Sequence, residues 1–541
     1  MRILVADKLA DEGLQVLHQS GADVTVKTGL SEADLARELA SGNYHALIVR
    51  SGAKVTARVL ENPGPLQAIA RAGVGVDNID LHAATARGIL VLNTAEASTL
   101  STAEHALALL FALARKIPQA HQHVRTGGWK RNDYQGTQLA GKTAGVVGLG
   151  RIGRAVAARL LALDLHVLGY DPYFADATAL DGKVQLVRDF DEFLARLDVI
   201  TFHVPGGEGT RHLLDRRRLF EVARKSLLVV NDARGEVLDE CALADALKEK
   251  RIAGAAIDVF AVEPPPKDHP LFALDNVVLT PHLGASTDEA QTAVSVEACR
   301  AIVAYLTRGE IRGAVNAGGL RLDLPPDERP FADLASRMGT LLAALCDGAL
   351  KSVTVRASGT RAPRLLSTLL RLATVELLRP HVEAGINVIN AEVIAKSMGT
   401  DLVTVHEPSP PQGMVGDIVS IRVQLHDGSS HRLLGTVYAD GLPRVLRIDN
   451  YAMDMVPEGQ MVLITNRDQP GVIGLVGTSF GDANVNIADM VISRDLTAEG
   501  GPTALMLLKV DSPPPDALLN RLRARPNILR VHSVVLPPRG K

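Results

Sequence analysis

The segment from Thr143 to Gly153, TAGVVGLGRIG, constrains this chain most, because an apolar run leads into Gly148-x-Gly150-x-x-Gly153 and then into a helical pattern. In such a strand, turn and helix, the first glycine permits a tight turn and the second lets the backbone approach a pyrophosphate. The third lets the helix pack closely on the strand. The helix N-terminus then points its positive dipole end at the phosphates. A glycine triplet also arises by chance in ordinary turns, so its context decides.

That context is a second apolar run, Leu165 to Tyr170, which ends at Asp171. An acidic residue about 20 residues beyond the glycines accepts hydrogen bonds from the adenosine ribose hydroxyls of a dinucleotide. The same carboxylate repels the 2′-phosphate of NADP. The sequence therefore predicts a Rossmann unit that binds NAD.

The composition is that of an ordinary globular protein of several domains. A chain of 541 residues is too long for one core, and about 150 residues per domain gives about three or four domains. The hydrophobic fraction is 46%, the charged fraction is 22%, and the net charge is −3. Such a charge gives no general attraction for polyanions, so we expect neither nucleic acid nor a membrane as a partner.

The cysteines and the first residues indicate a cytoplasmic protein. The cysteines are widely separated, without metal-ligand or redox spacing, so we expect unpaired thiols and no metal site: Cys241, Cys299 and Cys346. Charges at Asp7, Asp11 and Glu12 interrupt the stretch where a signal peptide needs an apolar core.

The first part of the chain alternates short β-branched runs with helical segments, which predicts α/β domains with doubly wound parallel sheets. Long helical patterns at Ser101 to Arg115 and Ser286 to Tyr305 are expected to cross between two domains. We therefore expect a discontinuous substrate-binding domain of residues 1–98 plus 282–317, with residues 99–281 as the inserted NAD-binding domain. The active site is expected in the cleft between them.

A second half with different chemistry follows the polar, proline-containing connector after Gly318 and Gly319. Residues 318–456 mix helices with alternating strands and carry no catalytic cluster, which predicts an α+β domain. Residues 457–541 read strand, helix, strand, strand, helix, strand, the order of a ferredoxin-like βαββαβ unit.

Arg234 is the first candidate catalytic residue. It follows the apolar run Ser226 to Val230, and the carboxyl ends of parallel strands are where open sheets bind ligands. A guanidinium there can clamp a substrate carboxylate with two hydrogen bonds. The alternative is a surface arginine that caps the following helix.

A histidine and two carboxylates complete the candidate set. Asp258 ends a buried strand, and Glu263 follows five residues later. Buried carboxylates need partners, so we expect Asp258 at the nicotinamide carboxamide and Glu263 beside His282, which follows the apolar run Asn276 to Leu279. A carboxylate raises the pKa of an adjacent imidazole and fixes its tautomer, which suits a base that accepts a hydroxyl proton.

The motifs GLGRIG, NDARG, GAAIDVF with Glu263, and PHLGAST resemble the D-isomer-specific 2-hydroxyacid dehydrogenase family over about residues 1–316. The resemblance implies Arg234 as substrate clamp and Glu263 as the partner of His282, the acid/base. It also implies four NAD contacts besides the glycines: Arg151, Ile152, Asp171 and Asp258. Because nucleotide domains of this family pair, it implies a homodimer or a homotetramer.

The two additional domains resemble those of the long-form members, which oxidise 3-phospho-D-glycerate to 3-phosphooxypyruvate at the start of L-serine biosynthesis. Under that resemblance Arg50 and Arg71 lie near a phosphate-bearing substrate. Arg131 resembles a position that reaches a neighbouring subunit's site. The alternative for each of the three is a solvated surface charge.

The last domain resembles an ACT domain, a small amino-acid sensor. The resemblance implies that Asn466, Asp468 and Asn486 hold an amino acid, expected to be serine, between paired modules. The alternative is a turn in which Pro470 and Gly471 merely start a helix. The middle domain resembles the intervening domain of the long forms, where a second, anionic effector site is expected without assigned residues.

Five positions depart from the family pattern. Asp232 replaces a small uncharged residue, Glu236 replaces a glycine, Gly206 replaces a bulkier residue, and Ala97-Ser98 stands where phosphoglycerate-oxidising members tend to have Gly-Asn. The two carboxylates either repel an anionic substrate, pair with Arg234 or point to solvent. A negative charge at Asp232 would favour the oxidised nicotinamide.

These departures keep two further hypotheses open. One is a related reductase for 2-oxoglutarate, glyoxylate or another 2-oxoacid. The other is a regulatory protein that binds NAD and an amino acid and has weak turnover.

Overall fold

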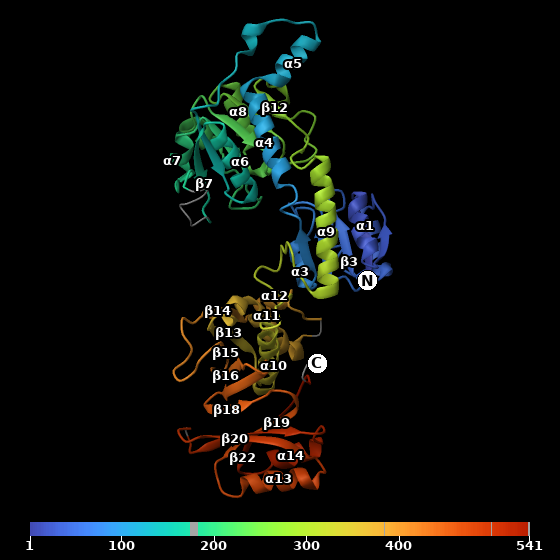
Figure 1. The fold of residues 1–541 in the computed structure, drawn as a ribbon, viewed down its shortest axis with the longest axis vertical. Coiled ribbons are helices and arrows are strands. Elements are labelled where there is room, and N and C mark those ends of the chain that lie inside the picture. The colour runs from blue at the N-terminus through green and yellow to red at the C-terminus, as the bar shows by residue number, and fades with distance from the viewer. Residues whose placement is uncertain (174–181, 383–384, 499, 539–541) are drawn as a thin grey trace.

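The computed structural model describes residues 1–173, 182–382, 385–498 and 500–538 (Figure 1). The described residues form four sheets, which follow one another along the chain. The first two sheets are parallel throughout, and the last two are mainly antiparallel. This is the predicted change from α/β to α+β architecture.

The first domain is built on a parallel sheet of order β2-β1-β3-β4-β5. Its strands are β1 (Arg2–Val5), β2 (Asp23–Val26), β3 (Ala46–Val49), β4 (Ala68–Arg71) and β5 (Leu90–Asn93). Its helices are α1 (Asp11–Gln19), α2 (Glu32–Gly42), α3 (Leu81–Ala86) and the returning α9 (Asp288–Arg308). Apolar residues of α9, among them Val294, Ala298 and Ile302, are buried in the same core as β1, β3 and β4. The predicted return of the chain to this domain is confirmed.

The second domain has a parallel sheet of order β12-β11-β10-β9-β6-β7-β8. Its strands are β6 (Thr143–Val147), β7 (His166–Tyr170), β8 (Gln185–Leu186), β9 (Val199–Phe202), β10 (Leu228–Asn231), β11 (Gly254–Ile257) and β12 (Val277–Leu279). Its helices are α4 (Thr99–Ala114), α5 (Ile117–Arg125), α6 (Arg151–Ala162), α7 (Phe190–Ala195) and α8 (Glu240–Lys248). One apolar core contains residues of α4 and α6, and another contains residues of α7 and α8. Helices therefore cover both faces, and the strand ends remain for ligands.

The helices α4 and α9 connect the two parallel domains, and their N-terminal ends meet. Ser101 Oγ and Thr287 Oγ1 lie 2.9 Å apart at that point, and Thr287 caps α9 by accepting the Ala290 N–H. Figure 1 shows the α9 helix extending along the first domain away from this crossing. The two domains also meet through Asp77 of the first and Arg234 of the second, which pair at 3.0 Å.

The third domain has a mixed sheet of order β14-β13-β15-β16-β17-β18, in which β13 and β14 are parallel. Its strands are β13 (Leu350–Ser358), β14 (Asp401–His406), β15 (Ile418–Leu425), β16 (Ser430–Val437), β17 (Pro443–Ile448) and β18 (Tyr451–Met455). Its helices are α10 (Arg329–Leu345), α11 (Leu366–Leu378) and α12 (Ala391–Ser397). It contacts the first domain, where Asn387 Nδ2 donates to the Gly88 carbonyl at 2.9 Å.

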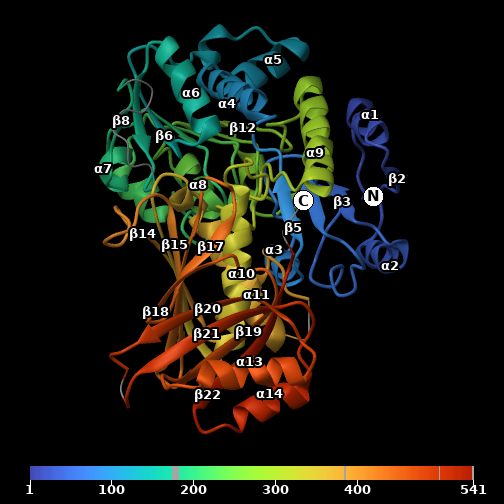
Figure 2. The same ribbon diagram turned by 60° about the horizontal axis from the view of Figure 1, so that its bottom comes forward.

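The last domain has the predicted βαββαβ order and an antiparallel sheet of order β20-β21-β19-β22. Its elements are β19 (Gly459–Arg467), α13 (Val472–Asp482), β20 (Ile487–Asp495), β21 (Thr503–Val510), α14 (Asp516–Arg523) and β22 (Ile528–Leu536). Side chains of β19 alternate: Val462 and Ile464 pack with α13 and α14, whereas Met461 and Leu463 pack in the core of the third domain. Figure 2 shows the sheet between its helices and the third domain.

A buried arginine joins the last two domains. Arg337 of α10 is 4% exposed and donates to the carbonyls of Pro457 and Pro537, at 2.8 and 2.6 Å. Because these carbonyls flank the last sheet, the arginine fixes that sheet on α10. In the part of the chain that the structure describes, no helix combines the length and the apolar character that a membrane span requires.

Candidate active site

The glycine loop after β6 has the backbone geometry that a pyrophosphate needs. Gly148 has φ +88°, and a Cβ there would lie 2.5 Å from the His203 carbonyl oxygen. A Cβ on Gly153 would lie 1.8 Å from the carbonyl oxygen of Gly148. A Cβ on Gly150 would meet no described atom within 4 Å, and no described side chain caps the start of α6. The loop and the helix N-terminus therefore fit NAD phosphates.

Asp171 at the end of β7 is tied to this loop. Its Oδ2 accepts the Leu149 N–H at 2.9 Å, and its Oδ1 accepts the Tyr173 N–H at 2.9 Å. These contacts fix the carboxylate beside the glycine loop. Arg151 begins α6 and pairs with Glu96 at 2.6 Å. Ile152 is half-buried beside it.

The predicted pairing of Glu263 with His282 is present. Glu263 Oε2 lies 2.8 Å from His282 Nδ1, and Glu263 Oε1 accepts the Phe260 N–H at 3.0 Å. His282 has φ +56° and donates its backbone N–H to the carbonyl of Asp258 at 2.8 Å. Because Nδ1 faces Glu263, Nε2 is the ring nitrogen that can exchange a proton with a substrate.

Asp258 holds the loop that carries His282. Its carboxylate is fully buried and accepts the Leu283 and Gly284 N–H groups at 2.8 and 2.9 Å, and the Thr280 hydroxyl at 2.5 Å. His105 Nε2 lies 3.2 Å away. Burial opposes ionisation, but hydrogen bonds from His105, Leu283 and Thr280 outweigh it and hold the pKa of Asp258 at about 2. The predicted contact with the nicotinamide carboxamide stays a prediction beside this observed role.

Arg50, Arg71 and Arg234 lie close enough for their charges to act on one another, and their expected contact with a substrate stays a prediction. Burial, followed by the positive charges of Arg234 and Arg50, lowers the pKa of Arg71 to about 10. Arg234 Nη1 donates to the Ala233 carbonyl at 2.6 Å, and Arg50 pairs with Gln291 of α9. An anion bound among these cations would relieve their mutual repulsion.

The RAGVGVDNID segment that Arg71 begins, which resembles the family's substrate loop, encloses these arginines, and the sequence reasoning missed only the parts played by its glycines and by Asp77. A Cβ on Gly73 would lie 1.4 Å from Arg71 Nη1, and a Cβ on Gly75 would lie 1.9 Å from Arg234 Nη2. Asp77 of the same loop pairs with Arg234, with its Oδ2 3.0 Å from Nε. The signal was present in the spacing of RAGVGVD, where glycines leave room for guanidinium groups.

Arg131 lies elsewhere. It is exposed on a short helix, Arg131–Tyr134, that follows α5. Figure 1 shows α5 at the end of the second domain opposite the first domain. The structure therefore does not bring Arg131 into the cleft of its own chain, and its role at a neighbouring subunit's site stays a prediction.

The unexpected carboxylates do not pair with Arg234, so that alternative was wrong. Glu236 turns to the neighbouring loop, where its Oε1 accepts the Gly207 N–H at 2.7 Å. A Cβ on Gly206 would lie 2.2 Å from the same oxygen. The glycine and the glutamate are therefore one coupled change: the missing side chain leaves the space that the carboxylate fills.

Asp232 does not point to solvent either, because it is 6% exposed. Its Oδ1 lies 3.5 Å from His203 Nδ1, and both carboxylate oxygens lack a hydrogen-bond partner among the described residues. Burial, followed by the negative charge of Asp258, raises the pKa of Asp232 to about 8. This aspartate is therefore largely protonated near neutral pH.

The candidate effector residues of the last domain are separated within one chain. Asn466 is 2% exposed and Asp468 pairs with Arg494 at 2.5 Å, at one end of β19. Asn486 precedes β20 and donates to Asp511 at 2.6 Å. Since Ile487 and Gln460 both pair with Val510, Asn486 lies at the opposite end of the sheet. A shared site would need a second module.

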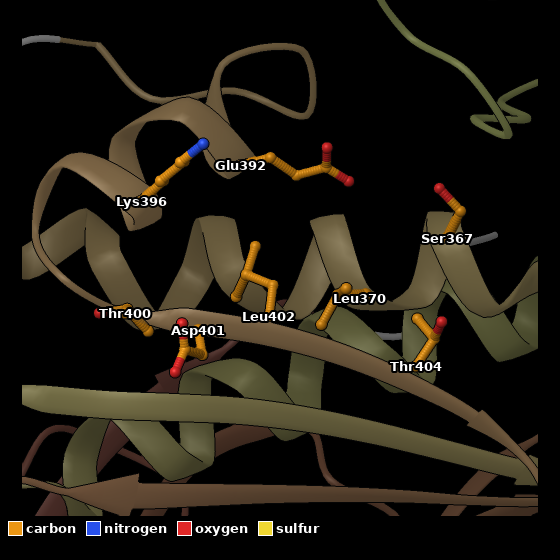
Figure 3. Close-up of a pocket in the computed structure, with 8 residues that line it drawn as sticks. All are labelled: Ser367, Leu370, Glu392, Lys396, Thr400, Asp401, Leu402 and Thr404. Atoms are coloured by element: carbon orange, nitrogen blue, oxygen red, sulfur yellow. The ribbon is translucent and has the colours of Figure 1, made fainter.

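A cavity of about 430 Å³ lies in the third domain between α11, α12 and β14 (Figure 3). Its charged lining residues are Glu392, Lys396 and Asp401. Glu392 also pairs with Arg371 at 3.0 Å. Acidic groups outnumber the basic one in this lining, so the cavity does not favour the anionic effector expected for this domain.

The thermal stability of an Asp232 variant tests whether this aspartate is a buried acid with a raised pKa. An acid whose folded pKa is raised from 3.8 to about 8 binds more protons in the folded state between those values, so its contribution to stability falls as pH rises through that window. We expect Asp232→Asn to raise the melting temperature relative to the parent more at pH 9 than at pH 5, by at least about 2–4 °C. Differential scanning calorimetry at both pH values measures the difference.

Glu236→Gln is the control, because Glu236 is bonded to a backbone N–H. Its melting temperature should differ from that of the parent by a similar amount at the two pH values. An equal shift of Asp232→Asn at pH 5 and pH 9 would contradict the raised pKa.

Comparisons with known proteins cover nearly the whole chain. Residues 107–284 match the D-isomer specific 2-hydroxyacid dehydrogenase NAD-binding domain, residues 328–449 the D-3-phosphoglycerate dehydrogenase intervening domain, and residues 460–527 the ACT domain. The D-3-phosphoglycerate dehydrogenase of Archaeoglobus fulgidus is 41% identical over 96% of this chain and 97% of its own length. That of Bacillus subtilis is 35% identical over 99% of this chain and 100% of its own.

Solved structures resemble the first two domains. The TT0316 protein from Thermus thermophilus is 34% identical, with a TM-score of 0.53, and the match covers 58% of this chain and 100% of that one. An NAD-dependent formate dehydrogenase from Staphylococcus aureus in complex with NAD is 28% identical, with a TM-score of 0.52, over 58% of this chain and 99% of that one. The glycine loop, the Glu263–His282 pair and these matches agree. The chain belongs to the D-3-phosphoglycerate dehydrogenase family, and its nucleotide domain is that of the NAD-binding D-isomer-specific 2-hydroxyacid dehydrogenases.

Proposed function

We propose that this chain oxidises 3-phospho-D-glycerate to 3-phosphooxypyruvate with NAD, the first step of L-serine biosynthesis. The observation that carries the proposal is the arginine cluster opposite a histidine–carboxylate pair. Arg50, Arg71 and Arg234 suit a substrate with both a carboxylate and a phosphate, whereas a simple 2-hydroxyacid has one anionic group. The curated relatives carry the name of the same activity.

In the proposed mechanism, Arg234 clamps the substrate carboxylate, while Arg71 and Arg50 attract the phosphate. His282 Nε2 accepts the proton of the C2 hydroxyl as the carbonyl forms. The chemistry that bound NAD would supply is that of a hydride acceptor for C2. Gly148, Gly150, Arg151, Ile152, Gly153 and Asp171 would hold that cofactor.

Glu263 makes His282 an effective base. Its carboxylate lies 2.8 Å from Nδ1, so it fixes the tautomer that leaves Nε2 unprotonated. When Nε2 takes the hydroxyl proton, the imidazolium that forms faces a negative charge. A charge-assisted hydrogen bond stabilises that state more than the neutral one.

The structure removes the reason for the two further hypotheses, a 2-oxoacid reductase and a regulatory protein with weak turnover. Both the reductase and the weakly active regulator were suggested by Asp232 and Glu236. Glu236 is bonded to Gly207, and Asp232 is buried beside His203. Neither carboxylate pairs with Arg234, so the departures are compatible with phosphoglycerate oxidation.

We also propose the domain boundaries 1–98 plus 282–317, 99–281, 318–456 and 457–541, which the four sheets support. The ACT domain suggests an amino-acid effector. We propose that it is serine, held by Asn466 and Asp468 of one module and Asn486 of another in a homodimer or homotetramer. The unpaired thiols of Cys241, Cys299 and Cys346 support a reducing, cytoplasmic location.

The function is tested by NADH formation from 3-phospho-D-glycerate in a coupled assay that removes the product. We expect His282→Asn to lower kcat by about 10²–10⁴-fold, the usual contribution of a general base, with a smaller effect on KM. Gln138 is exposed and precedes β6, at the opposite end of that strand from the glycine loop, so Gln138→Asn provides a control that keeps activity. Turnover of glyoxylate or 2-oxoglutarate with a higher kcat/KM than phosphoglycerate would contradict the proposed substrate.

Asp77 gives a second prediction. Its carboxylate pairs with Arg234 and is 71% exposed, so a substrate carboxylate has to compete with a weak ion pair. Such pairs contribute about 0.2–1 kcal/mol. We therefore expect Asp77→Asn to lower KM for phosphoglycerate about two- to fivefold, with kcat changed much less.

Steady-state kinetics at low ionic strength measure this effect. Asp11→Asn, in the same domain and also exposed, should leave KM unchanged. A raised KM in Asp77→Asn would show instead that Asp77 orients Arg234 for the substrate.

A further inference from the structure

Asp232 is a buried acid that the mechanism above does not use. It directly follows β10, two residues before Arg234, and its side chain is fully buried. Neither carboxylate oxygen has a hydrogen-bond partner among the described residues. Buried polar groups are nearly always partnered, and a buried carboxylate without a counter-ion is costly. The structure therefore leaves the ionised form of Asp232 without a counter-ion, and a positive charge placed nearby would stabilise that form.

The ionisable groups around Asp232 do not supply that positive charge. His203 Nδ1 lies 3.5 Å away, but burial lowers the pKa of His203 to about 3, so the imidazole is neutral. His203 Nε2 is engaged by the Thr201 hydroxyl at 2.9 Å. Asp258 adds negative charge, and the positive influence of His105 is directed mainly at Asp258.

Asp232 stands on the loop after β10 that also carries Arg234. Arg234 follows β10, and His282 follows β12 on the loop that Asp258 holds. For hydride transfer, the nicotinamide has to lie beside the substrate that these two side chains bind. Asp232 lies at the end of β10, and the neighbouring strand β11, between β10 and β12, is followed directly by Asp258, whose charge acts on Asp232.

The nicotinamide ring carries a positive charge in NAD⁺ and none in NADH. A positive charge near a desolvated carboxyl favours its ionised form. NAD⁺ therefore favours the ionised form of Asp232, whereas NADH does not. By linkage, the ionised form of Asp232 favours NAD⁺ over NADH.

We propose that Asp232 is a proton-linked selector of the cofactor's oxidation state: protonated in the free enzyme, it releases its proton to solvent when NAD⁺ binds and keeps it when NADH binds. The proposal rests on the NAD-binding part of the proposed function and is independent of the substrate. Affinity for NAD⁺ then rises with pH below the pKa of Asp232, whereas affinity for NADH does not.

Isothermal titration calorimetry of the full chain tests this without substrate. Titration of NAD⁺ at pH 7 in two buffers of different ionisation enthalpy should show the release of close to one proton per site, and titration of NADH should show close to none. Between pH 6.5 and 8 the Kd for NAD⁺ should fall by up to about tenfold per pH unit. Asp232→Asn should abolish both the proton release and the pH dependence.

Two comparisons separate Asp232 from other groups. Glu236→Gln removes a nearby carboxyl that is bonded to Gly207, and it should keep the slope of the parent. His282→Asn removes the other group that can titrate beside the nicotinamide, and it should also keep most of the slope. If Asp232→Asn does not fold, Asp232→Ala serves with the same expectation.

No proton release by the parent, or an unchanged slope in Asp232→Asn, would overturn the proposal, as would loss of the slope in His282→Asn alone. The outcome is distinct from that of the proposed function. A protein inert toward phosphoglycerate that still releases a proton with NAD⁺ would refute the substrate and support the selector.

Discussion

The site depends on the buried carboxylate of Asp258. It accepts two backbone N–H groups from the loop of His282 and approaches His105 on α4. One charge thereby joins a strand end, a loop and the helix that crosses between domains. Without it, the loop N–H groups would be buried without partners, and His282 would have no fixed position relative to Glu263. Hydrogen bonds keep this carboxylate ionised in spite of its burial, so the anchor does not depend on pH in the neutral range.

A second constraint is the need to bring backbone close to ligands and guanidinium groups. Gly148 and Gly153 leave no room for a Cβ because backbone atoms of the second domain approach them. Gly73 and Gly75 leave none because the arginines of the cleft occupy that space. The two glycine-rich turns thus have different roles. The turn after β6 leaves its backbone open to a cofactor, and the turn after β4 leaves space for guanidinium groups.

The sequence predicted the fold and the His–Glu pair because each rests on a local pattern. Strand-end positions, apolar runs and glycine spacing can be read without knowing which segments meet. The placement of Asp232, Glu236 and Asp77 could not be predicted, because it depends on contacts between segments distant along the chain. Glu236 meets Gly207, and Asp77 of the first domain meets Arg234 of the second. The distance between Asn466 and Asn486 likewise follows from strand register, which their motifs do not contain.

The contact between Gly206 and Glu236 also has a consequence for substitutions in this loop. A Cβ at position 206 would lie 2.2 Å from Glu236 Oε1, which is the far end of a flexible side chain. A larger residue at 206 would therefore displace the glutamate and break its hydrogen bond from the Gly207 N–H. The two positions are thus coupled through one hydrogen bond, so the effects of substitutions at 206 and 236 are not additive.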